Sequence, residues 1–172
     1  MANTFFPHSR VVLELRLGRV AALQELISAT PQALAARFPT GGGREESFLQ
    51  MAVRMDQTNV VMWLLSKGAQ ETPTSAPALL SDAVINGNVG LAKLFTQKGW
   101  DPWASVGDLA CPMYQAVAAG HLAMLDMWRL QKINLKQPDG DTGNNLLHVL
   151  MRALSSQPVQ DRTIDLAKWL MN

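Results

Sequence analysis

Apolar residues recur along this chain in stripes that predict short amphipathic helices. Within a stripe they fall at positions i, i+1, i+4 and sometimes i+5, a spacing that buries one face of a helix of about three turns. No segment of ordinary strand length alternates between apolar and polar residues, so an all-α chain is predicted. The stripes are Val60, Val61, Leu64 and Leu65; Leu91, Ala92 and Phe95; Met124, Leu125 and Trp128; and Leu166, Ala167 and Leu170.

A shorter helix that contains alanine is expected before each stripe. The anchor residues Ala52, Ala83 and Ala116 are 31 and 33 residues apart. Helix pairs with a period near 33 residues are typical of stacked solenoids, which usually act as binding surfaces. Glycines can end these helices in a left-handed conformation at little steric cost. They are Gly87 and Gly120 after the first helix of a pair, and Gly68 and Gly99 after the second.

These residues resemble the ankyrin repeat. Segments 47–70, 78–101 and 111–134 follow its pattern, with Gly68-Ala69 in the family's Gly-Ala place and Pro112, Gly120 and His121 matching the motif outright. A fourth unit begins at residue 143, and residues 11–30 look like a degenerate capping repeat. The resemblance implies an all-α ankyrin-repeat solenoid, with an N-terminal cap and about four helix-turn-helix repeats in one domain, 1–172. The expected segments are a cap over about 8–40 and repeats over about 44–74, 75–107, 108–139 and 140–172.

The sequence departs from the family pattern at several turns. Asp56 stands where the glycine between two helices is expected, and a short polar side chain tolerates that conformation with some strain. Lys132 replaces the glycine after the third pair, so a different turn conformation is expected there. About eight extra residues, 155–162, must lengthen a helix or form a loop. Pro158 favours a break over one continuous helix.

Composition narrows the classes of partner. The 172 residues are 48% hydrophobic and 17% charged with a net charge of +1, which gives no electrostatic case for nucleic acid or an anionic membrane. We expect no transmembrane helix and no secretory signal, because no apolar run reaches about 18 residues and the start lacks a charged and apolar leader. The single cysteine, Cys111, suits a reducing compartment. A cytoplasmic protein is therefore expected, in a host cytosol if the chain is a secreted effector.

No motif in the sequence predicts a catalytic, cofactor-binding or metal site. The triplet 41–43 lacks the Gly-Lys-Ser/Thr of a phosphate loop and is read as a linker. His8, His121 and His148 lie far apart, without a second ligand at metal spacing. Residues 139–144 resemble the start of a calcium loop but lack its final glutamate, since Leu150 is there. We therefore expect neither enzymatic activity nor a cofactor.

Trp103 allows two interpretations, which the sequence leaves open. It follows Pro102 in the segment 99–108, which corresponds to a projecting finger loop in the family, and a stiffened aromatic there suits an interface anchor. Alternatively, it folds back over the adjacent finger and covers the core.

The resemblance implies a protein partner, bound by finger loops and by the ends of the first helices along a concave face. Two alternatives remain. The chain could be the targeting part of a larger enzyme or secreted bacterial effector, or it could self-associate through its C-terminal face, although a monomer is expected. The family positions that map to partner binding are Arg16, Arg44, Glu46, Arg54, Met55, Ile85, Asn86, Trp103, Asp108, Asn144 and Arg152.

Overall fold

A computed structural model describes most of the chain, and the described part is mainly helical. It covers residues 8–29, 34, 36–41, 44–71, 76–104, 111–138, 143, 145–156 and 161–171. Ten helices and two short strands lie in these ranges, so the prediction of a mainly helical chain is confirmed. The chain divides into two compact units, residues 1–75 and 76–172. The boundaries expected for the individual repeats stay a prediction.

The first unit holds four helices and a β-hairpin. Helix α1 packs against α2 and α3, and α4 packs against α2 and α3. Strand β1 pairs antiparallel with β2, with Phe38 opposite Glu46. The rings of Phe38 and Phe48 meet edge to face at 4.7 Å, which fixes the hairpin to the core. The bounds are α1 (His8–Arg16), α2 (Val20–Ala29), β1 (Arg37–Gly41), β2 (Arg44–Ser47), α3 (Phe48–Arg54) and α4 (Thr58–Ser66).

The hairpin was not expected, because the glycine triplet after residue 40 was read as a linker. Each strand is only four or five residues long, too short for an alternating pattern to stand out. Residues 42 and 43 lie outside the described part of the chain.

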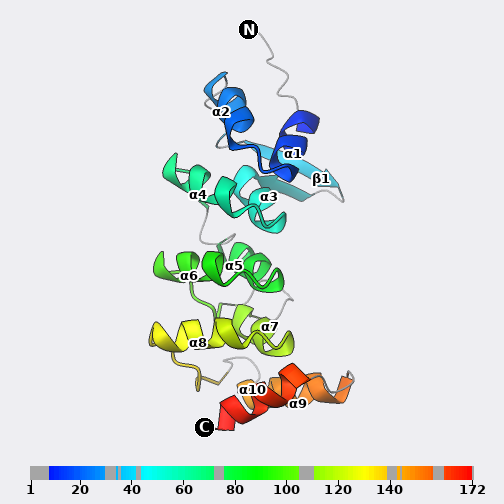
Figure 1. Cartoon of the computed structure of the whole chain (residues 1–172), viewed down its shortest axis with the longest axis vertical. Coiled ribbons are helices and arrows are strands. Elements are labelled where there is room, and N and C mark those ends of the chain that lie inside the picture. Colours follow the sequence, from blue (N-terminus) through cyan, green and yellow to red (C-terminus); the bar gives the residue numbers. More distant parts are fainter. Residues whose placement is uncertain are drawn as a thin grey trace. The chain divides into compact units, whose positions relative to one another are not determined.

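In the described part of the second unit the helices follow one another as three pairs, whose succession can be followed in Figure 1. Helix α5 packs against α7 and α7 against α9, while α6 packs against α8. Its core includes the fully buried Phe95 and Trp128, two residues of the predicted stripes. The bounds are α5 (Ala76–Ile85), α6 (Val89–Gln97), α7 (Pro112–Ala118), α8 (Leu122–Leu130), α9 (Leu146–Ser156) and α10 (Asp161–Met171).

The described turns inside the helix pairs share one geometry. Each contains a residue with positive φ whose N–H donates to the carbonyl three residues earlier, and the next N–H donates to the carbonyl five residues earlier. These two hydrogen bonds satisfy helix-end carbonyls that would otherwise have no partner. Asp56 adopts φ 55°, as expected for its place. The four positive-φ residues are Gly18, Asp56, Gly87 and Gly120.

The turns after the second helices repeat the same arrangement, and here one expectation was wrong. Lys132 has φ 62°, close to the glycines at 68 and 99, and its N–H donates to the Arg129 carbonyl. The following N–H, of Ile133, donates to the Trp128 carbonyl. The hydrogen bonds and the packing of α8 therefore impose the left-handed conformation on a lysine that disfavours it.

The extra residues before the last helix partly lengthen α9. This helix has 11 residues, whereas α3 and α7 have 7 each. Residues 157–160, which include Pro158, lie outside the described residues.

Candidate partner-binding surface

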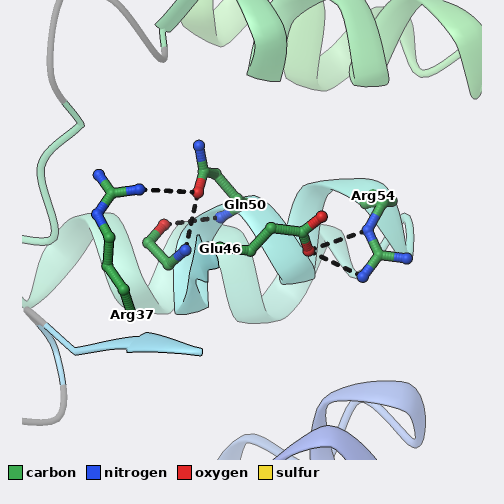
Figure 2. Close-up of polar contacts among 5 residues, drawn as sticks. Arg37, Glu46, Gln50 and Arg54 are labelled. Atoms are coloured by element: carbon green, nitrogen blue, oxygen red, sulfur yellow. Dashed lines mark hydrogen bonds and ion pairs between the residues drawn. The ribbon is translucent and has the colours of Figure 1, made fainter. Parts of the chain in front are cut away.

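The hairpin of the first unit leads directly into α3 through a capping box. Ser47 is the N-cap residue: its Oγ accepts from the Gln50 N–H at 3.1 Å, and its own N–H donates to Gln50 Oε1 at 2.8 Å. These two bonds satisfy backbone donors that the first turn leaves unpaired. They also fix the direction in which β2 enters the helix. Figure 2 shows this cluster of polar contacts.

A buried carboxylate ties the hairpin to the segment after α4. The side chain of Glu71 is fully buried, accepts from Ser47 Oγ, and lies 3.8 Å from Arg37 Nη2. Arg37 also donates to Gln50 Oε1 at 3.4 Å. A buried carboxylate is tolerated when a cation and hydrogen-bond donors compensate its lost hydration. The network thus joins both strands of the hairpin, through Arg37 and Ser47, to the segment after α4.

At the opposite end of α3, Arg54 forms an ion pair with Glu46 of β2. Its Nε and Nη2 donate to the same oxygen, Glu46 Oε2, at 3.1 and 2.8 Å (Figure 2). The Arg54 side chain remains 46% exposed, whereas that of Glu46 is 23% exposed. Two charge-assisted bonds hold the guanidinium plane in one orientation while one side of it faces solvent. Two of the predicted binding residues, from a strand and from a helix end, are therefore brought together.

The neighbouring helix end, that of α1, is held to the turn between α3 and α4 by a glutamine. Gln57 Nε2 donates to the Arg16 carbonyl at 3.2 Å. The amide lies against Gly18, where an added Cβ would meet Gln57 Oε1 at 2.5 Å. Arg16 is exposed and Met55 is half-buried. The ends of α1 and α3, together with Glu46, form what we call the helix-end surface of the first unit.

The second unit repeats this exposure pattern. The residue two places after each anchor position is exposed, while the anchor itself is buried. Ile85 is 62% exposed. Asn86 is also exposed. The exposed residues at this position are Arg54, Ile85 and Ala118. Arg152 holds the same place after the buried Leu150, and Arg16 lies at the matching end of α1.

A glycine–histidine contact connects two pairs of the second unit. A Cβ added at Gly87 would lie 3.3 Å from His121 Cε1, so a methyl group there would be in tight contact with the imidazole. His121 is half-buried and is the N-cap residue of α8. At the start of α9, His148 Nδ1 lies 2.9 Å from Oδ1 of Asn145, three residues earlier. Both contacts give these histidines a structural role in the turns.

The structure favours the second interpretation of Trp103. Its side chain is half-buried, its Nε1 donates to the Asn134 carbonyl at 3.0 Å, and its ring meets Tyr114 edge to face at 5.8 Å. These contacts hold the indole over its neighbours within the second unit. Trp100 likewise stacks on Phe95, at 4.4 Å between ring centroids.

The structure describes the remaining predicted binding residues only in part. Asp108 and Asn144 lie outside the described residues, and for Arg44 only the backbone in β2 is described. The sequence analysis missed Arg37, Gln50 and Glu71. A signal existed for one of them, since Ser47 followed by glutamine three residues later is the capping-box pattern.

The described residues contain no cluster of three or more histidines, cysteines, aspartates or glutamates suited to a metal ion. None of the described helices is both long enough and apolar enough to cross a membrane. No protein-family model matches the sequence, and no curated protein is significantly similar to it.

Proposed function

We propose that this chain is a non-enzymatic protein-binding module of the ankyrin-repeat type, which recognises a protein partner through hairpin and helix-end residues. The observation that carries the proposal is the Arg54–Glu46 pair. Its two hydrogen bonds orient a half-exposed guanidinium at the point where the hairpin meets α3. A side chain ordered before binding loses less conformational entropy when a partner arrives.

The composition of the helix-end surface supports this role. Arginine and methionine are enriched at the centres of protein interfaces, and Arg16, Arg54 and Met55 share this surface in the first unit. A planar guanidinium also suits bidentate recognition of a carboxylate. We therefore expect a partner that offers an acidic group beside an apolar one.

The regular exposure pattern supports a binding module more broadly. One position per helix pair is exposed and varied, as Arg54, Ile85, Ala118 and Arg152, while the residue two places before it is buried. A scaffold of this kind changes its partner by changing side chains at the exposed positions, without chemistry at the site. The single thiol, of the buried Cys111, suits the reducing cytoplasm as the place where it acts.

Affinity capture with matched variants tests the proposal. Wild-type protein, an Arg54→Ala/Met55→Ala variant and a Met62→Ala/Lys67→Ala control are each tagged and used to capture proteins from the native lysate. Met62, on α4, and Lys67, at the end of α4, are exposed and are not part of the helix-end surface. The partner should be recovered by wild type and control and lost from the Arg54/Met55 variant. Equal recovery by all three would reject the helix-end surface.

A further inference from the structure

The net charge of +1 conceals an uneven distribution of charge in the second unit. Cations gather along α6, at the end of α8 and in the turns that follow these two helices. The described carboxylates closest to them in the sequence are those of Asp101 and Asp126, while Asp139 and Asp141 lie outside the described residues. The cations are all exposed, and they are Lys93, Lys98, Arg129, Lys132 and Lys136.

Contacts between the two helices bring these residues to one edge of the unit. Helices α6 and α8 pack side by side (Figure 1). The residue that ends α8, Gln131, accepts from Thr96 Oγ1 at 2.7 Å, and its Nε2 donates to the Lys93 carbonyl at 3.5 Å. The chain after α8 returns to the segment after α6, because Trp103 Nε1 donates to the Asn134 carbonyl at 3.0 Å. The lysines next to these contacts in the sequence therefore share this edge.

The four lysines have no opposite charge to compensate them. None of them forms an ion pair or a side-chain hydrogen bond with a described residue. Arg129 differs, because Asp126 binds its guanidinium at 2.9 Å and the Trp169 ring lies 5.5 Å from it. The partial negative charge of a helix end favours a cation where α6 and α8 end, but it does not account for Lys93 in the middle of α6. The lysines therefore create a positive potential outside this edge.

A large apolar side chain lies among these cations. Leu130, the last residue of α8, is 79% exposed, the highest value among the described large apolar side chains. A single exposed leucine is common on protein surfaces, so its significance here comes from the uncompensated lysines around it. We call this surface the basic edge, and it consists of Lys93, Lys98, Arg129, Leu130, Lys132 and Lys136.

We propose that the basic edge docks on the surface of an anionic membrane, with Leu130 entering the boundary between headgroups and acyl chains. A lysine near an anionic lipid surface strengthens binding roughly fivefold, and an inserted apolar side chain adds to this attraction. The local distribution of charge carries this proposal, and the net charge does not. The basic edge shares no residue with the helix-end surface, so either proposal can fail alone.

The composition of the basic edge favours a membrane over other polyanions. Lysine is depleted at protein interfaces, where arginine is enriched, and the one arginine here is already paired with Asp126. A nucleic acid would place its phosphates against the cations, and Leu130 would then lose its hydration without gaining an apolar partner. A lipid surface offers both anionic headgroups and an apolar layer.

Flotation of the full chain with lipid vesicles tests the proposal. Vesicles of phosphatidylcholine with about 30% phosphatidylserine should bind the protein, and vesicles of phosphatidylcholine alone should not. Binding should fall at least about tenfold when the salt is raised from about 0.1 M to about 0.5 M. Protein that fails to bind the anionic vesicles at the lower salt, or that binds both kinds of vesicle equally, would overturn the proposal.

Variants locate the contact on the basic edge. Lys93→Gln/Lys136→Gln should weaken vesicle binding roughly 25-fold, or about fivefold for each lysine. The control Arg10→Gln/Lys67→Gln changes the net charge equally at exposed residues of the first unit and should stay within about twofold of wild type. Equal binding by the lysine variant and wild type would overturn the proposal.

The leucine is tested separately. Leu130→Gln should weaken vesicle binding about tenfold without changing its salt dependence, because no charge is lost. Unchanged binding would overturn the insertion of Leu130. Circular dichroism and urea unfolding of each variant should match wild type, since every changed side chain is exposed.

Other polyanions form the last arm of the experiment. A DNA duplex and polyglutamate, each used in place of the vesicles at the same salt, should bind more weakly than the anionic vesicles. Equal or tighter binding of either would assign the basic edge to a nucleic acid or to an acidic protein, and would overturn membrane docking.

Discussion

Arg54 donates two hydrogen bonds to a single carboxylate oxygen of Glu46, and this pair joins the end of α3 to the second strand of the hairpin. Both residues are also predicted binding residues. Their contact links the fold to the proposed binding surface, because the second strand of the hairpin orients the arginine at the end of α3.

Replacing Glu46 by glutamine should weaken partner binding more than it weakens the fold. A partly exposed ion pair such as this one contributes on the order of 1 kcal/mol to stability. Arg54 would then have to be ordered during binding, which costs about 0.5–1.5 kcal/mol, or roughly a two- to tenfold rise in Kd. Urea unfolding and calorimetric titration with the captured partner measure the two effects. The control is Glu45→Gln, one residue earlier and exposed, which should change neither. Equal Kd values for the two variants would show that Glu46 does not contribute to partner binding.

Ser47→Ala should cost about 1–3 kcal/mol of unfolding free energy. The change removes the N-cap acceptor of α3 and also the hydroxyl that donates to the buried Glu71 carboxylate. Ser66→Ala is a matched control, because its hydroxyl bonds only locally to the Trp63 carbonyl at an exposed helix end. That control should lose less than about 0.5 kcal/mol. Similar losses for both serines would show that the Ser47 network does not brace the hairpin.

Gly87→Ala should destabilise the protein more than Gly68→Ala does. Both glycines have positive φ, 69° and 84°, so both alanines carry a conformational penalty of about 1–2 kcal/mol. Only at position 87 does the new methyl group also press on His121, which adds roughly 1 kcal/mol. Thermal and urea unfolding measure the difference. If Gly68→Ala were the more damaging change, the glycine–histidine contact would not be tight.

Lys132→Gly should stabilise the protein by about 0.5–1 kcal/mol. The lysine is held at φ 62°, a conformation that glycine adopts without a steric penalty, although glycine loses more backbone entropy on folding. Asp56→Gly should gain less, because aspartate tolerates left-handed backbone better than lysine does. The midpoint of urea unfolding distinguishes the two variants. A loss of stability in Lys132→Gly would mean that the lysine side chain makes a compensating contact.

Much of the helical framework could be predicted from sequence, because it rests on local signals. The apolar stripes locate the second helices, and the glycines at 87 and 120 mark the turns inside the pairs. The hairpin could not be predicted, since its short strands are stabilised by the Phe38–Phe48 contact and the Glu71 network, which join distant segments. The turn at Lys132 was predicted wrongly for a similar reason. The packing of α8 outweighs the preference of a lysine for negative φ.

The candidate surface stays a prediction, since only the exposure of its residues is observed. The family resemblance maps Arg54 and Ile85 to the ends of first helices, and both are exposed. The resemblance could not reveal that Arg54 pairs with Glu46, because that contact depends on where the hairpin folds. It also could not decide the orientation of Trp103, whose indole bonds to the backbone of Asn134, 31 residues away.

Site-specific photo-crosslinking tests the central claim most directly. A photoreactive amino acid is placed at Met55, beside Arg54 on the helix-end surface, or at Met62, which is 51% exposed on α4. Illumination in the native lysate should join a partner of one defined mass to the Met55 variant and not to the Met62 variant. Crosslinks to that partner from Met62 but not from Met55 would contradict the account, because the partner would then bind another face.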